Sequence, residues 1–245
     1  MMKHHQAGSE LLLSILGLGR RHRGWPAILA LTLLLNACGH ATISIPGKPR
    51  PQEETYHHCP AKGAPGGDPE LDLLKNRIDL PPHPQTWTFH RLLHLPWPKA
   101  VDGVAMKQWS VSERRQVDRY EGSGVRVVGY IASVSVLPIP ESANCYGLGG
   151  FDTHLWLASR PRAPRKDSIV TEVTPRVEAR ESGFDEDQMD RLAREGAKVR
   201  ITGWLFLDNR HDSAVEKIRA TLWEIHPVTR IDVWRGGRWV EQFGS

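Results

Sequence analysis

The stretch that decides the fold reads VRVVGYIASVSV and covers residues 125–136. It is long, rich in β-branched residues and therefore typical of a strand. Gly129 interrupts it, and a glycine inside such a strand often marks a bulge or a sharp bend. A long bent strand can serve both sides of a barrel. We therefore expect this stretch to begin a β-barrel.

More strands and one helix follow this stretch. The expected strands cover residues 154–159, 169–174, 198–207 and 218–225. Residues 231–234 extend the last of these after Pro227, and a short final strand over 239–243 follows a Gly-Gly turn. The helix is expected over 185–195, because acidic residues fill its first turn and Gly196 closes it. The order is thus three strands, a helix and two strands.

This order resembles the oligonucleotide/oligosaccharide-binding (OB) fold, a five-stranded Greek-key barrel with a helix between strands 3 and 4. The resemblance covers residues 122–234. The motifs DTH at 152–154, EVTPR at 172–176, TGW at 202–204 and WEIHPV at 223–228 are also similar to a group of uncharacterised bacterial proteins with such a barrel. The resemblance implies a mainly β fold, preceded by a short helical segment, and no activity.

The N-terminus reads as an export signal. A basic segment at 20–23 precedes an apolar run at 25–35, which is too short to span a bilayer as a helix but suits a signal peptide. The run ends in Leu35-Asn36-Ala37-Cys38, which resembles the bacterial lipobox. The resemblance implies a lipoprotein signal peptide over 1–37, palmitate on Cys38 and a periplasm-facing place in the cell envelope, at the outer membrane because Gly39 follows. An uncleaved anchor and an ordinary secretory leader are the alternatives.

The net charge of +4 comes largely from that leader, where Lys3, Arg20, Arg21 and Arg23 face only Glu10. The rest of the chain carries +1. Nucleic-acid binding relies on an excess of Lys and Arg, so we do not expect it. The expected partners are the membrane, through the lipid, and an envelope protein, a peptide or a glycan.

Two cysteines remain after Cys38. Cys59 and Cys145 form an even pair, and in an oxidising compartment such a pair favours a disulfide. The spacing does not show whether their Cα atoms come close enough.

The chain from Cys38 onward divides into three expected parts. Residues 38–69 are rich in Pro and Gly and are typical of a tether. Residues 70–121 form a helical and irregular wrap around the barrel, in which Ser110 and Glu113 have the spacing of a capping box. Residues 122–245 form the OB-like barrel with a C-terminal hairpin.

Strand parity points to the candidate site residues. Asp152 and His154 lie two apart, as do Glu224 and His226, so each pair faces one side of its strand. Glu172 lies on the third strand. If the first three strands are neighbours and the fifth closes against the first, all five side chains converge at one end of the barrel.

Such a cluster has two interpretations. Histidine and carboxylate oxygen suit one transition-metal ion such as Zn, Mn or Fe, which in a hydrolase activates water. Alternatively the cluster is a structural network in which Arg176 pairs with Glu172. We expect the structural network, with no cofactor and no catalytic residue. The function predicted is a lipid-anchored envelope protein with a binding or scaffolding barrel, the alternative being an exported metal-dependent hydrolase.

Overall fold

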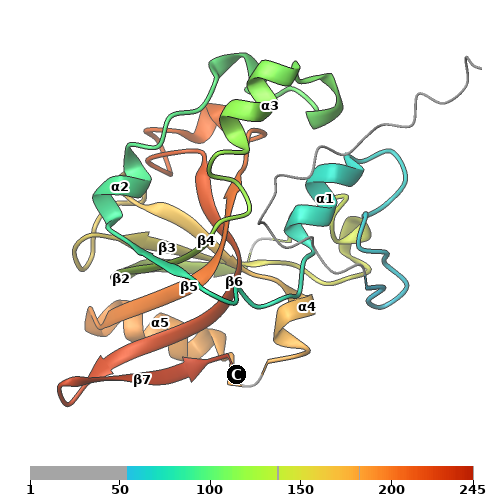
Figure 1. Ribbon diagram of the computed structural model, residues 1–245. Coiled ribbons are helices and arrows are strands. Elements are labelled where there is room, and N and C mark those ends of the chain that lie inside the picture. Colours follow the sequence, from blue (N-terminus) through green and yellow to red (C-terminus); the bar gives the residue numbers. More distant parts are fainter. Residues whose placement is uncertain (1–53, 137, 182, 245) are drawn as a thin grey trace, which may run out of the picture. The chain divides into compact units, whose positions relative to one another are not determined.

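The computed structural model describes residues 54–136, 138–181 and 183–244. At its centre lies a closed five-stranded barrel (Figure 1). Its strands are β2 (Gly124–Val136), β3 (Thr153–Ala158), β4 (Ile169–Val173), β5 (Lys198–Leu207) and β6 (Trp223–Arg235). They follow the order β2-β3-β4-β6-β5, and β5 returns to β2. The mainly β, OB-like fold predicted from the sequence is confirmed.

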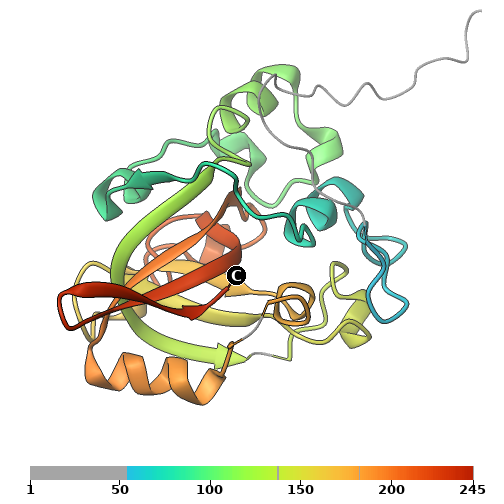
Figure 2. The ribbon, with the colours of Figure 1, turned by 60° about the horizontal axis from the view of Figure 1, so that its bottom comes forward.

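Strand β2 closes the barrel because it serves two neighbours. Its first half pairs with β5, from Gly124 to Tyr130, and its second half pairs with β3, from Tyr130 to Val136. Figure 2 shows the long bend of this strand. The bulge falls between Ile131 and Ser133 rather than at Gly129. Glycine has a different role there: a Cβ on Gly129 would lie 2.7 Å from the carbonyl oxygen of Ala158.

One expected pairing was wrong. Strand β5, not the last barrel strand, closes against β2, and β6 lies between β4 and β5. Strand β6 also begins at Trp223 rather than Ile218 and runs unbroken through Pro227 to Arg235. Proline cannot donate to a strand ladder. The β5–β6 register is irregular around Gly203, whose added Cβ would lie 2.3 Å from the Pro227 carbonyl oxygen, so the proline is accommodated at this break.

The helix between β4 and β5 is α5 (Glu186–Glu195), as predicted. The side chain of Asp185 accepts a hydrogen bond from the Gln188 N–H, and Gly196 ends the helix with a left-handed φ of 65°. Met189 and Leu192 bury one face, and the helix packs against β2. A short helix, α4 (Pro175–Glu178), precedes it, and β7 (Arg238–Phe243) pairs with β6 beyond the barrel.

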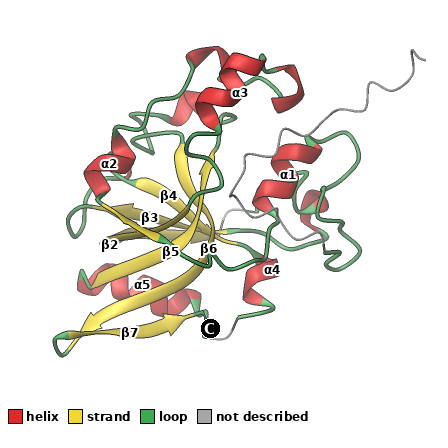
Figure 3. Ribbon diagram, viewed as in Figure 1, coloured by secondary structure: helices red, strands yellow, loops and turns green. Residues whose placement is uncertain are grey.

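The segment before the barrel is a wrap of short elements (Figure 3). They are α1 (Pro69–Lys75), β1 (Gln85–Trp87), α2 (Phe89–Leu93) and α3 (Val111–Val117), with short 3-10 turns at Lys99–Val101 and Met106–Gln108. The capping box predicted for α3 is present, since Ser110 and Glu113 each bind the other's backbone N–H. The sequence did not indicate β1, which pairs in parallel with β2. Further 3-10 turns lie at Cys145–Gly147, Arg165–Asp167 and Asp212–Ala214.

The part of the expected tether that the structure describes, residues 54–68, is packed against the folded domain. Cys59 and Cys145 form a disulfide with their Cα atoms 5.7 Å apart. The guanidinium of Arg176 donates to the backbone oxygens of Glu54 at 2.7 Å and Cys59 at 2.8 Å. Residues 54–68 are therefore joined to the folded domain by a disulfide and by hydrogen bonds.

Candidate functional site

The five ionisable residues singled out by strand parity do meet at one end of the barrel. Asp152 directly precedes β3, and His154 pairs with Glu172 of β4. The parallel pair of β4 and β6, at Thr171 and Ile225, brings Glu224 and His226 beside them. The cluster thus depends on β6 lying next to β4, which is a property of the topology.

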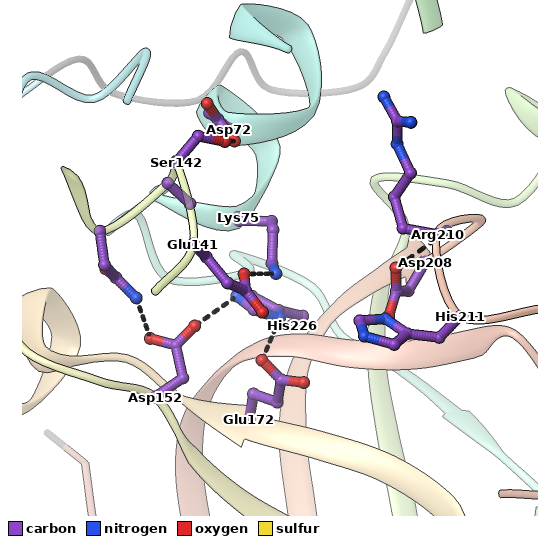
Figure 4. Close-up of polar contacts among 12 residues, drawn as sticks. Asp72, Lys75, Glu141, Ser142, Asp152, Glu172, Asp208, Arg210, His211 and His226 are labelled. Carbon is purple, nitrogen blue, oxygen red and sulfur yellow. Dashed lines mark hydrogen bonds and ion pairs between the residues drawn. The ribbon is translucent and has the colours of Figure 1, made fainter. Parts of the chain in front are cut away.

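His226 is the centre of this cluster and is fully buried. Its Nδ1 lies 2.9 Å from Glu172 Oε2 and 3.6 Å from Glu224 Oε2, and its Nε2 lies 3.8 Å from Asp152 Oδ2. Figure 4 shows Asp152 and Glu172 approaching its ring. Burial alone lowers the pKa of His226, but Glu172 and Glu224 outweigh it and raise the pKa to about 10. Neither ring nitrogen has a partner in hydrogen-bonding direction.

Glu172 is shared between two histidines. Its Oε1 lies 3.1 Å from His154 Nε2, while its Oε2 faces His226. Burial raises the pKa of Glu172, but His226 and His154 hold it well below its usual range. Burial lowers the pKa of His154, yet Glu172 raises it to about 9. In the protein without an ion, this electrostatic arrangement favours a carboxylate between two imidazolium rings.

Neighbouring side chains hold Asp152 in place and surround His226. The Asn144 side-chain amide donates to Asp152 Oδ1 at 3.0 Å. The buried Lys75 of α1 forms an ion pair with Glu141, on the other side of His226 (Figure 4). Burial raises the pKa of Asp152, an effect that His226 opposes.

Three further residues extend the site, and sequence reasoning missed them. Arg219 is buried between Asp208, at 3.0 Å from Nη1 to Oδ2, and Glu224, which its Nη2 contacts. His211 Nδ1 contacts the same Oδ2 of Asp208. Arg219, the His211 contact and Lys75 together hold the pKa of Asp208 far below its usual range, against the effect of burial. The only sequence signal was that Asp208 follows β5 directly.

Arg176 does not pair with Glu172 as the structural network required. Its Nε donates to Asn76 Oδ1 at 3.0 Å, and its other nitrogens bind backbone oxygens of residues 54–60. Pro175 begins helix α4 directly after β4, so the next residue leaves the direction of the strand. Arg176 therefore fastens the N-terminal segment to the barrel instead of neutralising the cluster.

A cavity of about 110 Å³ adjoins the cluster. Its polar wall consists of His154, Glu172, Asp208, His211, Arg219 and Glu224. Its apolar wall consists of Ile139, Trp156, Val170, Ala214 and Ile218. A wider hollow of about 370 Å³ shares Ile139, Asp208 and His211 with it. These three residues thus border both hollows, whereas Asp152 and His226 line neither of them.

The residues fit a metal ion. One ligand atom each from Asp152, Glu172 and His226 lie within 4.8 Å of one another. Ligands about 2.1 Å from one ion lie roughly 3 to 4 Å apart. Glu172 Oε2 and both nitrogens of His226 are buried without a hydrogen-bond partner, as is Glu224 Oε2 beside them. An imidazole binds a given ion through only one of its nitrogens. One cation here would therefore contact one nitrogen of His226 together with the carboxylates of Asp152 and Glu172.

Cys38 and the predicted signal peptide lie outside the described residues. Within the described part of the chain, no helix has the length and apolar character needed to cross a bilayer. Comparison of the chain with protein-family models, with curated proteins and with solved structures finds no match in any of the three.

Proposed function

We propose that this chain is a lipid-anchored cell-envelope protein whose OB-like barrel binds one divalent transition-metal ion through Asp152, Glu172 and His226. One observation carries the metal site: a fully buried histidine and two buried carboxylates present ligand atoms within 4.8 Å of one another. In the absence of an ion, a proton on His226 offsets the negative charge of Glu172. A divalent cation can take the place of that proton.

The donor set also selects the kind of ion. Imidazole together with carboxylates suits Zn, Mn or Fe. Ligands in such sites are held by outer partners, as Asp152 is by Asn144 and Glu172 by His154. The three ligands come from two strands and a strand start, so rigid elements define the geometry.

Without an ion, a protonated His226 neutralises Glu172, and the cluster is a structural network in which His226 takes the place expected for Arg176. The two states compete, because a ligating imidazole must lose its proton. Metal binding is therefore expected to release protons from the cluster.

The test uses the chain from Gly39 onward, purified without chelator and without a polyhistidine tag. Elemental analysis and calorimetric titration with Zn²⁺ or Mn²⁺ should give about one equivalent per chain. His226→Ala and Glu172→Gln should abolish this stoichiometric binding, while His90→Ala, at an exposed position of α2, should not change it. Binding that is absent, or that persists in both site variants, would overturn the metal site.

The lipid anchor is supported by the lipobox-like sequence and by the Cys59–Cys145 disulfide, which suits an oxidising compartment. Expression of the full chain in a bacterium with labelled palmitate should label the protein and recover it with outer membranes. Cys38→Ala should remove the label. A secreted, unlabelled wild-type protein would contradict the anchor and leave the metal site standing.

A further inference from the structure

The cavity beside the cluster has two chemically different walls. One polar side is shared with the cluster, through His154, Glu172 and Glu224. The other polar side is formed by Asp208, His211 and Arg219, which the metal site does not use. A small cavity with an apolar wall and a few converging polar groups is a common form of ligand site.

His211 is held in one orientation within this cavity. Its Nδ1 contacts Oδ2 of the buried Asp208, which Arg219 holds from another side. The His211 ring is about half exposed and lines both the small cavity and the wider hollow. Its Nε2 is thus the ring atom available to a molecule entering the site. In Figure 4 His211 and Asp208 lie side by side, apart from His226.

A histidine oriented through Nδ1 by a buried carboxylate is the arrangement that general acid–base catalysis uses. The bond to Asp208 raises the pKa of His211, so its protonated form persists to higher pH than that of a free imidazole. A structural ion pair would need the same contact but no cavity beside it. Both Asp208 and His211 line the cavity, which favours the catalytic role.

We propose that this cavity is a hydrolytic active site for a small carboxylic ester or amide, in which His211 gives a proton to the leaving group. The inference rests on the proposed function, since a bound divalent ion supplies an activated water at neutral pH. The water oxygen bonds to the acyl carbon, and the bond from that carbon to the leaving oxygen or nitrogen breaks. The leaving atom takes the His211 proton, and His211 recovers one proton from the water, so a carboxylic acid and an alcohol or amine result.

Charge and size indicate the substrate class. Four carboxylates meet here, those of Asp152, Glu172, Asp208 and Glu224. The positive charges beside them are those of Arg219, of protonated His154 and His211, and of the divalent ion. A neutral acyl group adds no further charge to this buried cluster. The apolar wall of Trp156, Val170 and Ile218 suits a short hydrocarbon chain, and about 110 Å³ admits only a small one.

The experiment uses the metal-loaded chain from Gly39 onward with 4-nitrophenyl acetate and butyrate, and with 4-nitrophenyl phosphate for comparison. We expect metal-dependent, saturable hydrolysis of the acyl esters and none of the phosphate. His211→Gln should lower kcat about 100-fold or more, the usual range for general acid–base catalysis, with unchanged metal content. The matched control His90→Gln should keep the wild-type rate.

A binding measurement complements the rates. Calorimetric titration with acetohydroxamate, an acyl analogue that binds metals, should show binding to the loaded protein and none to the metal-free protein. Ile218→Trp places a larger side chain at the half-exposed edge of the cavity. It should weaken hydroxamate binding about tenfold or more while metal content stays the same.

The outcomes separate the two proposals. One equivalent of metal with no acyl hydrolysis, or with equal rates in wild type and His211→Gln, overturns this inference and leaves the metal site intact. Hydrolysis of the phosphate alone overturns the substrate class. Absence of the metal overturns both proposals.

Discussion

The buried polar site can be divided into two groups of residues, a ligand half and an arginine half, which differ in the source of the positive charge that balances their carboxylates. In the ligand half (Asp152, Glu172 and His226), both imidazole nitrogens and one carboxylate oxygen lack hydrogen-bond partners. In the arginine half (Asp208, His211, Arg219 and Glu224), Arg219 binds Asp208 and Glu224 together, although Arg219 Nε and Glu224 Oε2 also lack hydrogen-bond partners. The arginine half thus contains a fixed cation, whereas the positive charge of the ligand half depends on the protonation of His226. Only the ligand half can exchange its positive charge, which is why the proposed metal ion is assigned to it.

Removing the arginine gives the largest expected effect. Arg219→Met would leave Asp208 and Glu224 buried without their cation, and breaking a buried pair in this way costs about 3–5 kcal/mol. Chemical denaturation at pH 7 measures the loss. Arg235→Met, at an exposed residue of the β6–β7 turn, should change the free energy of unfolding by less than about 0.5 kcal/mol. A loss below about 1 kcal/mol in Arg219→Met would mean that the arginine half does not depend on its own cation.

The pH dependence of the free energy of unfolding tests whether a proton on His226 supplies the positive charge of the ligand half. The pKa of His226 is about 10 in the folded protein, against an unfolded value of 6.5. Because the folded pKa is raised, the stabilisation is complete below pH 6.5 and is lost as pH rises toward 10. Metal-free protein should therefore unfold more easily at pH 9 than at pH 6.

Two controls separate this effect from others. His226→Gln should flatten the dependence between pH 6.5 and 9, and a bound ion should reverse its direction, since deprotonated His226 binds the ion. Thermal unfolding at several pH values, with and without Zn²⁺, measures both. A metal-free protein with constant stability over this range would contradict the charged state of His226.

The ligand half could be predicted from the sequence because strand parity is a local property. Asp152 with His154, and Glu224 with His226, follow from a period of two residues. Their meeting with Glu172 needed the parallel pairing of β4 and β6, which neither the local pattern nor the expected strand order predicted. The parity argument reached the right cluster although it assigned the wrong closing strand.

The arginine half could not be predicted in this way. Asp208 and His211 lie after β5 in a loop that has no periodicity, and Arg219 lies before β6 in a segment that was wrongly expected to be a strand. Only the folded chain brings the three residues to Glu224. The predicted pair of Arg176 and Glu172 was wrong for a related reason. Helix α4 begins at Pro175, so the chain turns away from Glu172 before it reaches Arg176. Local patterns predict which face a side chain takes, and long-range packing decides which charges become partners.

Loss of the disulfide should affect the two halves unequally. Cys145 is joined to Cys59 and lies next to Asn144, which holds Asp152. Cys59→Ala with Cys145→Ala should lower the free energy of unfolding by about 2–4 kcal/mol, the typical effect of one disulfide. Zn²⁺ affinity should also fall, while the ion pairs of Arg219 do not involve this loop. Unchanged affinity in a folded double variant would show that the loop does not position Asp152.

The smallest expected effect concerns His154, which contacts the ligand half without supplying one of the three ligands. His154 Nε2 holds Glu172 Oε1, so His154→Gln removes the charge from the partner that orients a ligand. Loss of such an outer partner typically lowers metal affinity 10–100-fold, about 1–3 kcal/mol. Calorimetric titration with Zn²⁺ measures the change, and His226→Ala, which removes a ligand itself, should lose far more. If His154→Gln lost as much as His226→Ala, His154 would itself be a ligand, and the ion would lie nearer the cavity than the three-residue cluster places it.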